Sequence, residues 1–237
     1  MTLLEAIEIR RSRRKYLEQS IRPELAKKLQ AFAKEYSEVA NARIELVFDN
    51  GKAFDGLRKT YGLLAGVTHY AGLIAKKGDA IAEEKLGYYG ELFMLQAVAL
   101  GLGTCWVGGS FAREDCPFEM AEDEKLYCTI SFGYCDERDN PREWLIQRIT
   151  HRKTKRAEDM MSAVGPAPGW FMPAMRAVER APSAVNSQPV RFTYKDGVTR
   201  AGVENNSWID LGIAKLHFEL GAGGGEWEFG NYGGFTK

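Results

Sequence analysis

The sequence of 237 residues lacks the signals that mark several specialised classes of protein. Its 32 Lys+Arg and 32 Asp+Glu give a formal net charge of zero, whereas nucleic-acid-binding proteins usually carry a basic excess. No apolar run approaches the length of a membrane span, and Glu5 and Glu8 interrupt the N-terminal apolar stretch, so no signal peptide is indicated. We therefore expect a cytoplasmic protein that binds neither nucleic acid nor membrane.

Spacings typical of metal sites and of catalytic side chains are also missing. The sequence has four cysteines and three histidines: Cys105, Cys116, Cys128, Cys135, His69, His151 and His217. They form no Cys-x-x-Cys pair and no zinc-site spacing, so we expect reduced thiols and packed or surface histidines. No Gly-x-x-x-x-Gly-Lys-[Ser/Thr] loop, nucleophile–base pair or acid/base dyad stands out. Any chemistry is therefore expected to come from a cofactor, with no metal and no catalytic side chain.

Hydrophobic periodicity predicts alternating helices and strands, which indicates an α+β (α/β layered) fold. Helices are predicted at residues 3–11, from Pro23 onward, and at 83–100, 172–180 and 209–220. Strands are predicted at residues 44–48, 127–134 and 190–194. Residues 63–75 are interpreted as a further buried strand, although so short an apolar run is also compatible with a helix.

The polar stretch 135–159 predicts a boundary, and we divide the chain into subdomains at 1–156 and 157–237. A helix ending in Leu-Gly-x-Gly occurs in both parts, at 100–103 and 220–223, which hints at a duplicated half-unit. A second part of about 80 residues would be marginally stable alone, so we expect it to pack closely on the first.

The densest cationic stretch is Arg-Arg-Ser-Arg-Arg at residues 10–14, named here the arginine cluster. A phosphate monoester is close to dianionic, and a guanidinium meets it with two parallel donors. Arginines flanking a serine supply charge and a hydroxyl donor together. The cluster alone is equally typical of a solvated surface run, so its interpretation depends on the rest of the chain.

The second stretch is Gly-Leu-Gly-Thr-Cys-Trp-Val-Gly-Gly at residues 101–109, named here the glycine segment. Glycines let a backbone approach a flat ligand and expose its amide donors, and Thr104 and Trp106 suit a pocket wall. A helix end followed by a strand would also explain Gly101 and Gly103. A helix end followed by a strand would explain Gly108 and Gly109 less easily, because they come after Trp106 and Val107.

The third stretch is Ala-Pro-Ser-Ala-Val-Asn-Ser-Gln-Pro at residues 181–189, named here the proline loop. Pro182 and Pro189 fix its backbone at both ends, and neither can donate to a sheet. Ser183, Asn186 and Gln188 are polar side chains suited to the edge of a heterocycle. Composition alone favours an ordinary polar loop after a helix.

Together these stretches resemble the FMN-dependent nitroreductase family. Arg-Arg-Ser-x-Arg-Lys-Tyr at 10–16 is similar to that family's N-terminal signature, and residues 181–189 are similar to its Ala-Pro-Ser-x-x-Asn-x-Gln-Pro signature. Residues 99–109 resemble the family's segment before the flavin, and residues 130–134 resemble its following strand. The resemblance implies a nitroreductase-like fold with a central, mainly antiparallel sheet flanked by helices.

The order of the signatures departs from the usual one, because the proline loop follows the final strand of the first part. In typical members, which are homodimers with two flavins, the Arg-Arg-Ser segment and the loop of one site come from different subunits. The sequence therefore resembles a divergent single-chain branch, a fused pseudo-dimer in which residues 157–237 replace the second subunit. The second part has no Arg-Arg-Ser equivalent, which implies one flavin per chain.

The resemblance also assigns residues to the cofactor. Phosphate contacts fall to Arg10 and Arg14 and to Arg152 or Lys153, and Arg11 and Ser12 are expected near the phosphate or the polar edge of the flavin. Gly108 and Gly109 would place backbone amides near the flavin ring, and the proline loop would line its opposite side. The expected cofactor-binding residues are Arg10, Arg11, Ser12, Arg14, Thr104, Trp106, Val107, Gly108, Gly109, Arg152, Lys153, Pro182, Ser183, Ala184, Asn186 and Gln188.

The implied function is FMN-dependent reduction of a small-molecule acceptor such as a nitroaromatic or quinone. NADH or NADPH would be the co-substrate in a ping-pong scheme, and the sequence does not choose between them. Two alternatives stay open: a flavin-binding sensor or carrier without turnover, with the glycine-rich tail over the flavin, and another reduction on the same fold, such as dehalogenation or enoate reduction. A monomer is expected to be possible, and a homodimer is not excluded.

Overall fold

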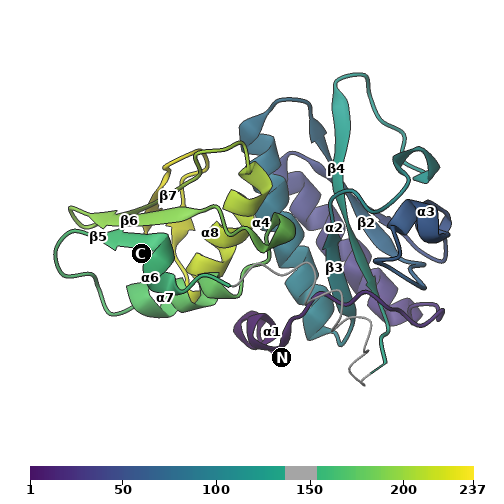
Figure 1. Cartoon of the computed structure of the whole chain (residues 1–237), viewed down its shortest axis with the longest axis horizontal. Coiled ribbons are helices and arrows are strands. Elements are labelled where there is room, and N and C mark those ends of the chain that lie inside the picture. The colour runs from purple at the N-terminus through teal and green to yellow at the C-terminus, as the bar shows by residue number, and fades with distance from the viewer. Residues whose placement is uncertain (137–153) are drawn as a thin grey trace.

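The computed structural model describes residues 1–136 and 154–237, and its strands form two sheets at opposite ends of the molecule (Figure 1). The first sheet contains β1 (Arg43–Val47), β2 (Tyr70–Lys76), β3 (Gly103–Val107) and β4 (Glu124–Gly133). The second contains β5 (Met161–Ala163), β6 (Arg191–Lys195), β7 (Val198–Gly202), β8 (Glu226–Trp227) and β9 (Gly234–Thr236). The α+β prediction with mainly antiparallel strands is confirmed, with one sheet in each part of the chain.

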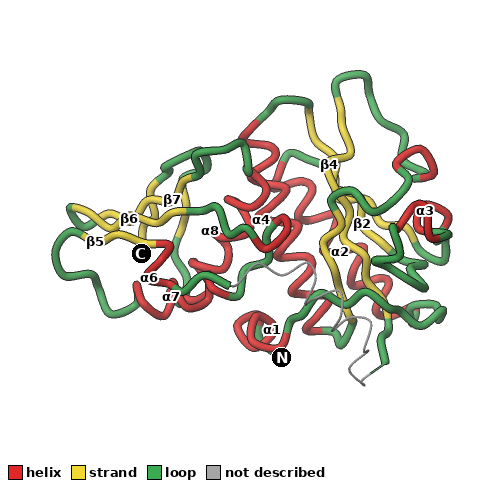
Figure 2. The backbone as a smooth tube through the Cα atoms, in the orientation of Figure 1, coloured by secondary structure: helices red, strands yellow, loops and turns green. Residues whose placement is uncertain are grey.

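The longer helices are α2 (Pro23–Ala40), α4 (Ala80–Ala99), α7 (Phe171–Glu179) and α8 (Trp208–Ala222). Of these longer helices, α4 and α8 lie between the two sets of strands (Figure 2). The short helices are α1 (Leu3–Ile9), α3 (Leu57–Thr60) and α6 (Ala157–Met160), and single turns lie at η1 (Lys52–Phe54), η2 (Arg113–Asp115) and η3 (Ala184–Asn186). As predicted, α2 begins at Pro23, where the missing N–H removes no helical hydrogen bond.

The two sheets share one strand order. The first runs β1-β2-β4-β3, and the second runs β6-β7-β9-β8, with β5 added in parallel beside β6. In each, a helix precedes the first two strands, a second helix follows them, and the last two strands follow that helix. All neighbours in both four-strand sets are antiparallel. This correspondence supports the interpretation of two related half-units.

Helices α4 and α8 join the two parts at a close crossing that two glycines permit. A Cβ on Gly212 would lie 1.9 Å from the carbonyl oxygen of Glu84, and one on Gly87 would lie 2.1 Å from that of Ile209. Both contacts are with backbone atoms, which cannot turn aside as a side chain can. The backbones therefore approach where only glycine fits, and the second part packs closely on the first.

Each sheet has its own apolar core. Phe93, Phe132 and Leu73 are fully buried between the first sheet and α2 and α4. In the second part, Phe218 of α8 stacks on Phe192 of β6 with ring centroids 5.0 Å apart. The helices predicted at residues 83–100 and 209–220 thus contribute buried side chains to these cores.

Two predicted elements were wrong in extent. The helix predicted at 3–11 ends at Ile9, because Arg10 has ψ 131° and leaves the helical path. The strand predicted at 63–75 begins only at Tyr70. Gly66 has φ 68° there, and its missing side chain leaves room for the carbonyl oxygen of Tyr16, which a Cβ would approach to 2.3 Å. Residues 65 and 66 therefore contact Lys15 and Tyr16, after the arginine cluster, and do not extend β2.

Candidate functional site

The arginine cluster lies against the edge strand β3 of the glycine segment. Ser12 and Thr104 form an isolated parallel bridge, and the amide of Arg13 donates to the carbonyl oxygen of Thr104 over 2.8 Å. A second parallel bridge joins Lys15 to Ala65. The cluster is therefore extended backbone at a sheet edge, rather than the cationic last turn of a helix that the sequence predicted.

Arg10 connects this edge to the second part of the chain. Its Nη2 donates to the carbonyl oxygen of Arg180, 3.4 Å away, directly after α7 and before the proline loop. Its Nε and Nη1 are buried and have no hydrogen-bond partner among residues 1–136 and 154–237. Buried donors left in this state are uncommon in proteins and are a reason to look for a ligand. A guanidinium in this position suits an anion such as a phosphate.

The other members of the cluster differ in exposure. Arg11 is exposed, whereas Ser12 and Arg14 are half-buried. Arg13 reaches in another direction, because its Nη2 donates to the carbonyl oxygen of Asp136 over 2.6 Å. Gly103 makes room for two side chains, since a Cβ there would lie 2.3 Å from Sγ of Cys135 and 2.9 Å from Cγ of Arg13. Close approach of Cys135 and Arg13, rather than of a ligand, thus explains Gly103.

The residues of the glycine segment differ in their burial. Thr104 and Val107 are buried, and Oγ1 of Thr104 has no hydrogen-bond partner among the described residues. Trp106 is half-buried, and its indole N–H donates to Glu91 of α4 over 2.7 Å. Gly108 and Gly109 are exposed, and a Cβ on either would meet no atom within 4 Å. These two glycines therefore lie beside open space at the end of β3.

The proline loop holds an unusual backbone by internal hydrogen bonds. Val185, Asn186 and Gln188 have φ values of 48°, 51° and 43°, a region that favours glycine. Ser183 stabilises the turn: its carbonyl oxygen accepts from the amide of Asn186 over 3.0 Å, and its hydroxyl accepts from that of Gln188 over 2.9 Å. Strain of this kind persists only where the surroundings hold it, and it gathers at binding sites.

Gln188, expected as a cofactor-binding residue, is buried, and its side chain supports the proline loop. Its amide nitrogen donates to the carbonyl oxygen of Glu179 over 3.0 Å, and its amide oxygen accepts from the backbone N–H of Lys155 over 2.7 Å. The ammonium of Lys155 donates to the Gln188 carbonyl oxygen over 2.8 Å. Arg152 and Lys153, assigned to the phosphate by resemblance, lie outside the described residues, so Lys155 is the nearby basic residue that the structure does place.

Asp210, in the first turn of α8, was not predicted from the sequence. Its Oδ1 accepts from the amide of Ala184 over 3.1 Å, so α8 holds the tip of the proline loop. Burial raises the pKa of Asp210 to about 6, and the Ala184 N–H, which favours the carboxylate, lowers it in part. Asp210 lines a small cavity beneath the loop together with Pro182 and Gln188.

A buried polar chain joins the glycine segment to the helix before the proline loop. The second Glu91 oxygen, Oε1, lies 2.8 Å from Nε2 of His217 in α8. Nδ1 of His217 lies 3.0 Å from the carbonyl oxygen of Ala177 in α7. Glu91 and His217 are both fully buried. Glu91 was visible in the sequence as a polar exception in an apolar helix, but its partners were not. His217 is a packed residue, as predicted.

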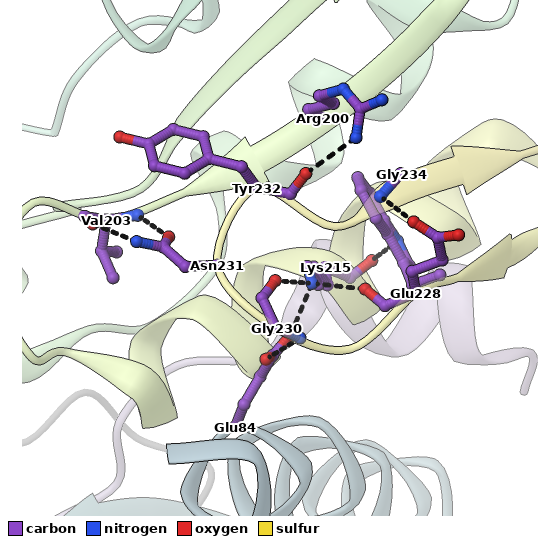
Figure 3. A network of polar contacts seen from close by, with 10 residues as sticks. Glu84, Arg200, Val203, Lys215, Glu228, Gly230, Asn231, Tyr232 and Gly234 are labelled. Atoms are coloured by element: carbon purple, nitrogen blue, oxygen red, sulfur yellow. Dashed lines mark hydrogen bonds and ion pairs between the residues drawn. The ribbon is translucent and has the colours of Figure 1, made fainter.

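A second buried pair crosses the same two helices. Nζ of Lys215 lies 2.5 Å from Oε1 of Glu84, and both side chains are fully buried. Lys215 also donates to the carbonyl oxygens of Glu228 and Gly230, at 2.8 and 3.0 Å (Figure 3). Burial lowers the pKa of Lys215, while the neighbouring carboxylate of Glu84 opposes that effect. This pair therefore anchors the glycine-rich tail, whose strands β8 and β9 belong to the second sheet.

The described residues contain no group of three or more His, Cys, Asp and Glu side chains arranged to hold a metal ion. The arginine cluster offers unpartnered donors on Arg10, and the glycine segment offers two exposed glycines at the end of β3. Such an arrangement can bind and orient a flat, phosphorylated ligand. It offers no nucleophile with an adjacent base.

Proteins similar to this chain include nitroreductases. A family model described as "Putative TM nitroreductase" matches residues 2–222. The crystal structure of a "putative nitroreductase" from Thermotoga maritima superposes with a TM-score of 0.64 at 22% identity, covering 99% of this chain and 92% of that one. No curated protein matches the sequence.

More distant structures cover a smaller share of the chain. An FMN-dependent nitroreductase from Clostridium difficile has 24% identity and a TM-score of 0.46 over 57% of this chain and 88% of that one. A nitroreductase with bound FMN from Bacteroides fragilis has 20% identity and a TM-score of 0.42 over 59% of this chain and 91% of that one.

Proposed function

Because the chain belongs to the nitroreductase family, we propose that it is an FMN-dependent oxidoreductase whose flavin lies where the arginine cluster, the glycine segment and the proline loop converge. The observation that carries the proposal is Arg10, which contacts the end of α7 and has two buried nitrogens without a partner among the described residues. A cofactor phosphate at this point would satisfy them.

The phosphate end of the cofactor fits the arginine cluster. Arg10 offers buried donors, while Ser12 and Arg14 are half-buried in the same extended stretch. A charge-assisted hydrogen bond is roughly twice as strong as a neutral one, so a dianionic group is the ligand that gains most here. Arg11, which is exposed, would contribute positive charge from the solvent side.

The ring end fits the open space beside Gly108 and Gly109. Their amides can face a flat heterocycle closely, because no side chain intervenes. The proline loop would line the other side of the ring through Pro182, Ser183, Ala184 and Asn186. Its fixed backbone lets it bind without the entropy loss of ordering a flexible loop.

When bound, FMN supplies hydride and electron transfer at its N5 atom, which explains why no catalytic side chain is needed. The chain's own residues bind the phosphate, orient the ring and place amide donors where negative charge would develop. NADH or NADPH would supply electrons in a ping-pong scheme, and a nitroaromatic, quinone or similar small molecule would accept them. We expect this reaction to occur in the cytoplasm.

A stoichiometry of one flavin per chain is supported because each half of the chain has one binding element that the other half does not have. Between α7 and β6 lies the proline loop, whereas α2 and β1 are separated by Asn41 and Ala42 alone. The first half thus has no counterpart of the loop, and the sequence of the second half has no counterpart of the arginine cluster. We propose that the halves, 1–156 and 157–237, form a fused pseudo-dimer that builds one site and can act as a monomer.

Purified protein tests the proposal directly. We expect a yellow protein that releases one FMN per 26.5 kDa chain and whose visible absorbance bleaches when NADH or NADPH is added without oxygen. A protein that remains colourless after incubation with FMN contradicts the proposal. Flavin that binds but is reduced by neither nucleotide favours a carrier or sensor, and a substrate panel distinguishes nitroreduction from other reductions.

A further inference from the structure

The chain from Trp106 through Glu91 and His217 to Ala177 spans both halves of the molecule. It begins on β3, two residues before Gly108, and passes through the centres of α4 and α8. It ends on the last turn of α7, which runs into the proline loop. The glycine segment is thus connected through three consecutive hydrogen bonds to α7, the helix that leads into the proline loop.

The protonation of this chain follows from its acceptors. The Ala177 carbonyl oxygen can only accept, so Nδ1 of His217 carries a hydrogen. Oε2 of Glu91 accepts from the Trp106 indole. One further proton must lie between Nε2 of His217 and Oε1 of Glu91, 2.8 Å apart, because two bare acceptors would repel each other. The pair is therefore either an imidazolium and a carboxylate or a neutral imidazole and a carboxylic acid.

Both side chains are fully buried, and every polar atom that they carry is used in the chain. Apolar side chains of the same volume would fill this space without desolvating polar groups. What the polar chain adds is a fixed geometry, since each hydrogen bond restricts the distance between the elements that it joins.

We propose that Glu91 and His217 are positioning residues, which act through Trp106 and Ala177 to hold the glycine segment and the proline loop at the separation that a flavin ring requires. The proposal rests on the proposed FMN function for the ligand, but the coupling of the two stretches is a property of the protein without ligand. It can therefore be tested in both states.

The Glu84–Lys215 pair provides a matched control. It is equally buried and crosses the same two helices, but its further partners, Glu228 and Gly230, belong to the tail. Glu91→Leu/His217→Leu and Glu84→Leu/Lys215→Met each remove both partners and so leave no unpaired buried charge. Glu91→Gln keeps the geometry, because its amide oxygen can accept from Trp106 and its NH₂ can donate to a neutral His217.

Hydrogen exchange of the protein without flavin is the first measurement. Glu91→Leu/His217→Leu should speed exchange of the amides at 184–188 and 104–109, whereas Glu84→Leu/Lys215→Met should do so at 228–234. FMN titration is the second: the Glu91/His217 double variant should raise the Kd about tenfold or more, because a binding site that is no longer preorganised loses affinity. Glu91→Gln should restore both values to near those of the wild type.

A folded Glu91/His217 double variant with unchanged exchange at 184–188 and an FMN Kd within twofold of the wild type would overturn the proposal. So would an equal loss of FMN affinity in both double variants, because it would indicate general destabilisation. Wild-type protein that binds no FMN overturns the proposed function instead, and the exchange data alone then decide whether the two stretches are coupled.

Discussion

Arg10 and Arg180 connect the two halves of the chain by hydrogen bonds and an ion pair. Arg10 donates to the carbonyl oxygen of Arg180 at 3.4 Å, while Arg180 forms an ion pair with Glu8 at 2.7 Å and donates to the Glu8 carbonyl oxygen at 3.5 Å. The ion pair is about half exposed and contributes little stability by itself. Its consequence is geometric, because it places the end of α1 beside the start of the proline loop.

Replacing Arg10 should weaken FMN binding without weakening the fold. In Arg10→Met, the loss of charge-assisted hydrogen bonds should raise the FMN Kd by about tenfold to a hundredfold, which corresponds to about 1.5–3 kcal/mol. The melting temperature without FMN should stay the same or rise, since a buried guanidinium with unpartnered nitrogens is removed. Fluorescence titration and thermal unfolding measure the two effects. Arg191→Met, at an exposed position on β6, is the control and should change neither.

Adding one methyl group at Gly212 should destabilise the protein. Alanine favours a helix over glycine by about 1 kcal/mol, but its Cβ would lie 1.9 Å from the Glu84 carbonyl oxygen. Forcing α4 and α8 apart should cost about 1–3 kcal/mol or more, so the steric effect wins. Urea unfolding should show this loss for Gly212→Ala. It should show a change of less than about 0.5 kcal/mol for Gly169→Ala, where a Cβ meets nothing within 4 Å. Equal stabilities would contradict the close crossing.

A methyl group at Gly108 should weaken FMN binding and leave the stability of the fold unchanged, in contrast to one at Gly212. Its Cβ would meet no protein atom within 4 Å, so Gly108→Ala should change the free energy of unfolding by less than about 0.5 kcal/mol. A methyl group beside the proposed flavin ring should nevertheless raise the FMN Kd about tenfold. Paired unfolding and flavin titrations check this prediction. An unchanged FMN Kd would contradict the placement of the flavin ring beside Gly108.

Asp210 should give the protein a pH-dependent stability below neutral pH. Its pKa rises from 3.8 to about 6 on folding because of burial, so the folded state binds the proton more tightly. The resulting stabilisation is full below pH 3.8 and is lost as the pH rises through 6, by at most about 3 kcal/mol. Asp210→Asn should flatten this part of the curve, as measured by urea unfolding between pH 4 and 7. Burial also raises the pKa of Glu219, but that contribution is common to both proteins and cancels in the difference.

Breaking the Lys215–Glu84 pair from one side should be severe. Lys215→Met leaves the Glu84 carboxylate fully buried with the Gly230 amide as its remaining hydrogen-bond partner among the described residues. Removal of one partner of a buried pair costs about 3–5 kcal/mol, and the tail should become accessible to protease. Adding Glu84→Leu should recover part of the loss, because the unpaired charge is then gone. Lys34→Met, on the exposed face of α2, should be neutral.

Local patterns in the sequence were sufficient for elements whose cause is local. The start of α2 at Pro23 and the apolar helices α4 and α8 were predicted, because capping residues and periodicity act within a few residues. The hairpin strand β7, which follows the Asp196–Gly197 turn, was not predicted. Its residues Val198–Gly202 include exposed and small side chains, and pairing with β6 and β9 decides their conformation.

The sequence by itself determined the family, through three short stretches whose residue types suit a phosphate, a flat ring and a rigid loop. It could not determine how the stretches meet, because that depends on contacts between residues distant in the chain. Tertiary structure decided that the arginine cluster lies in extended form against β3, and that Arg10 contacts the residue after α7. It also selected the partners of Glu91 and Lys215. A buried charge is stabilised by whatever packing brings beside it, which no local pattern specifies.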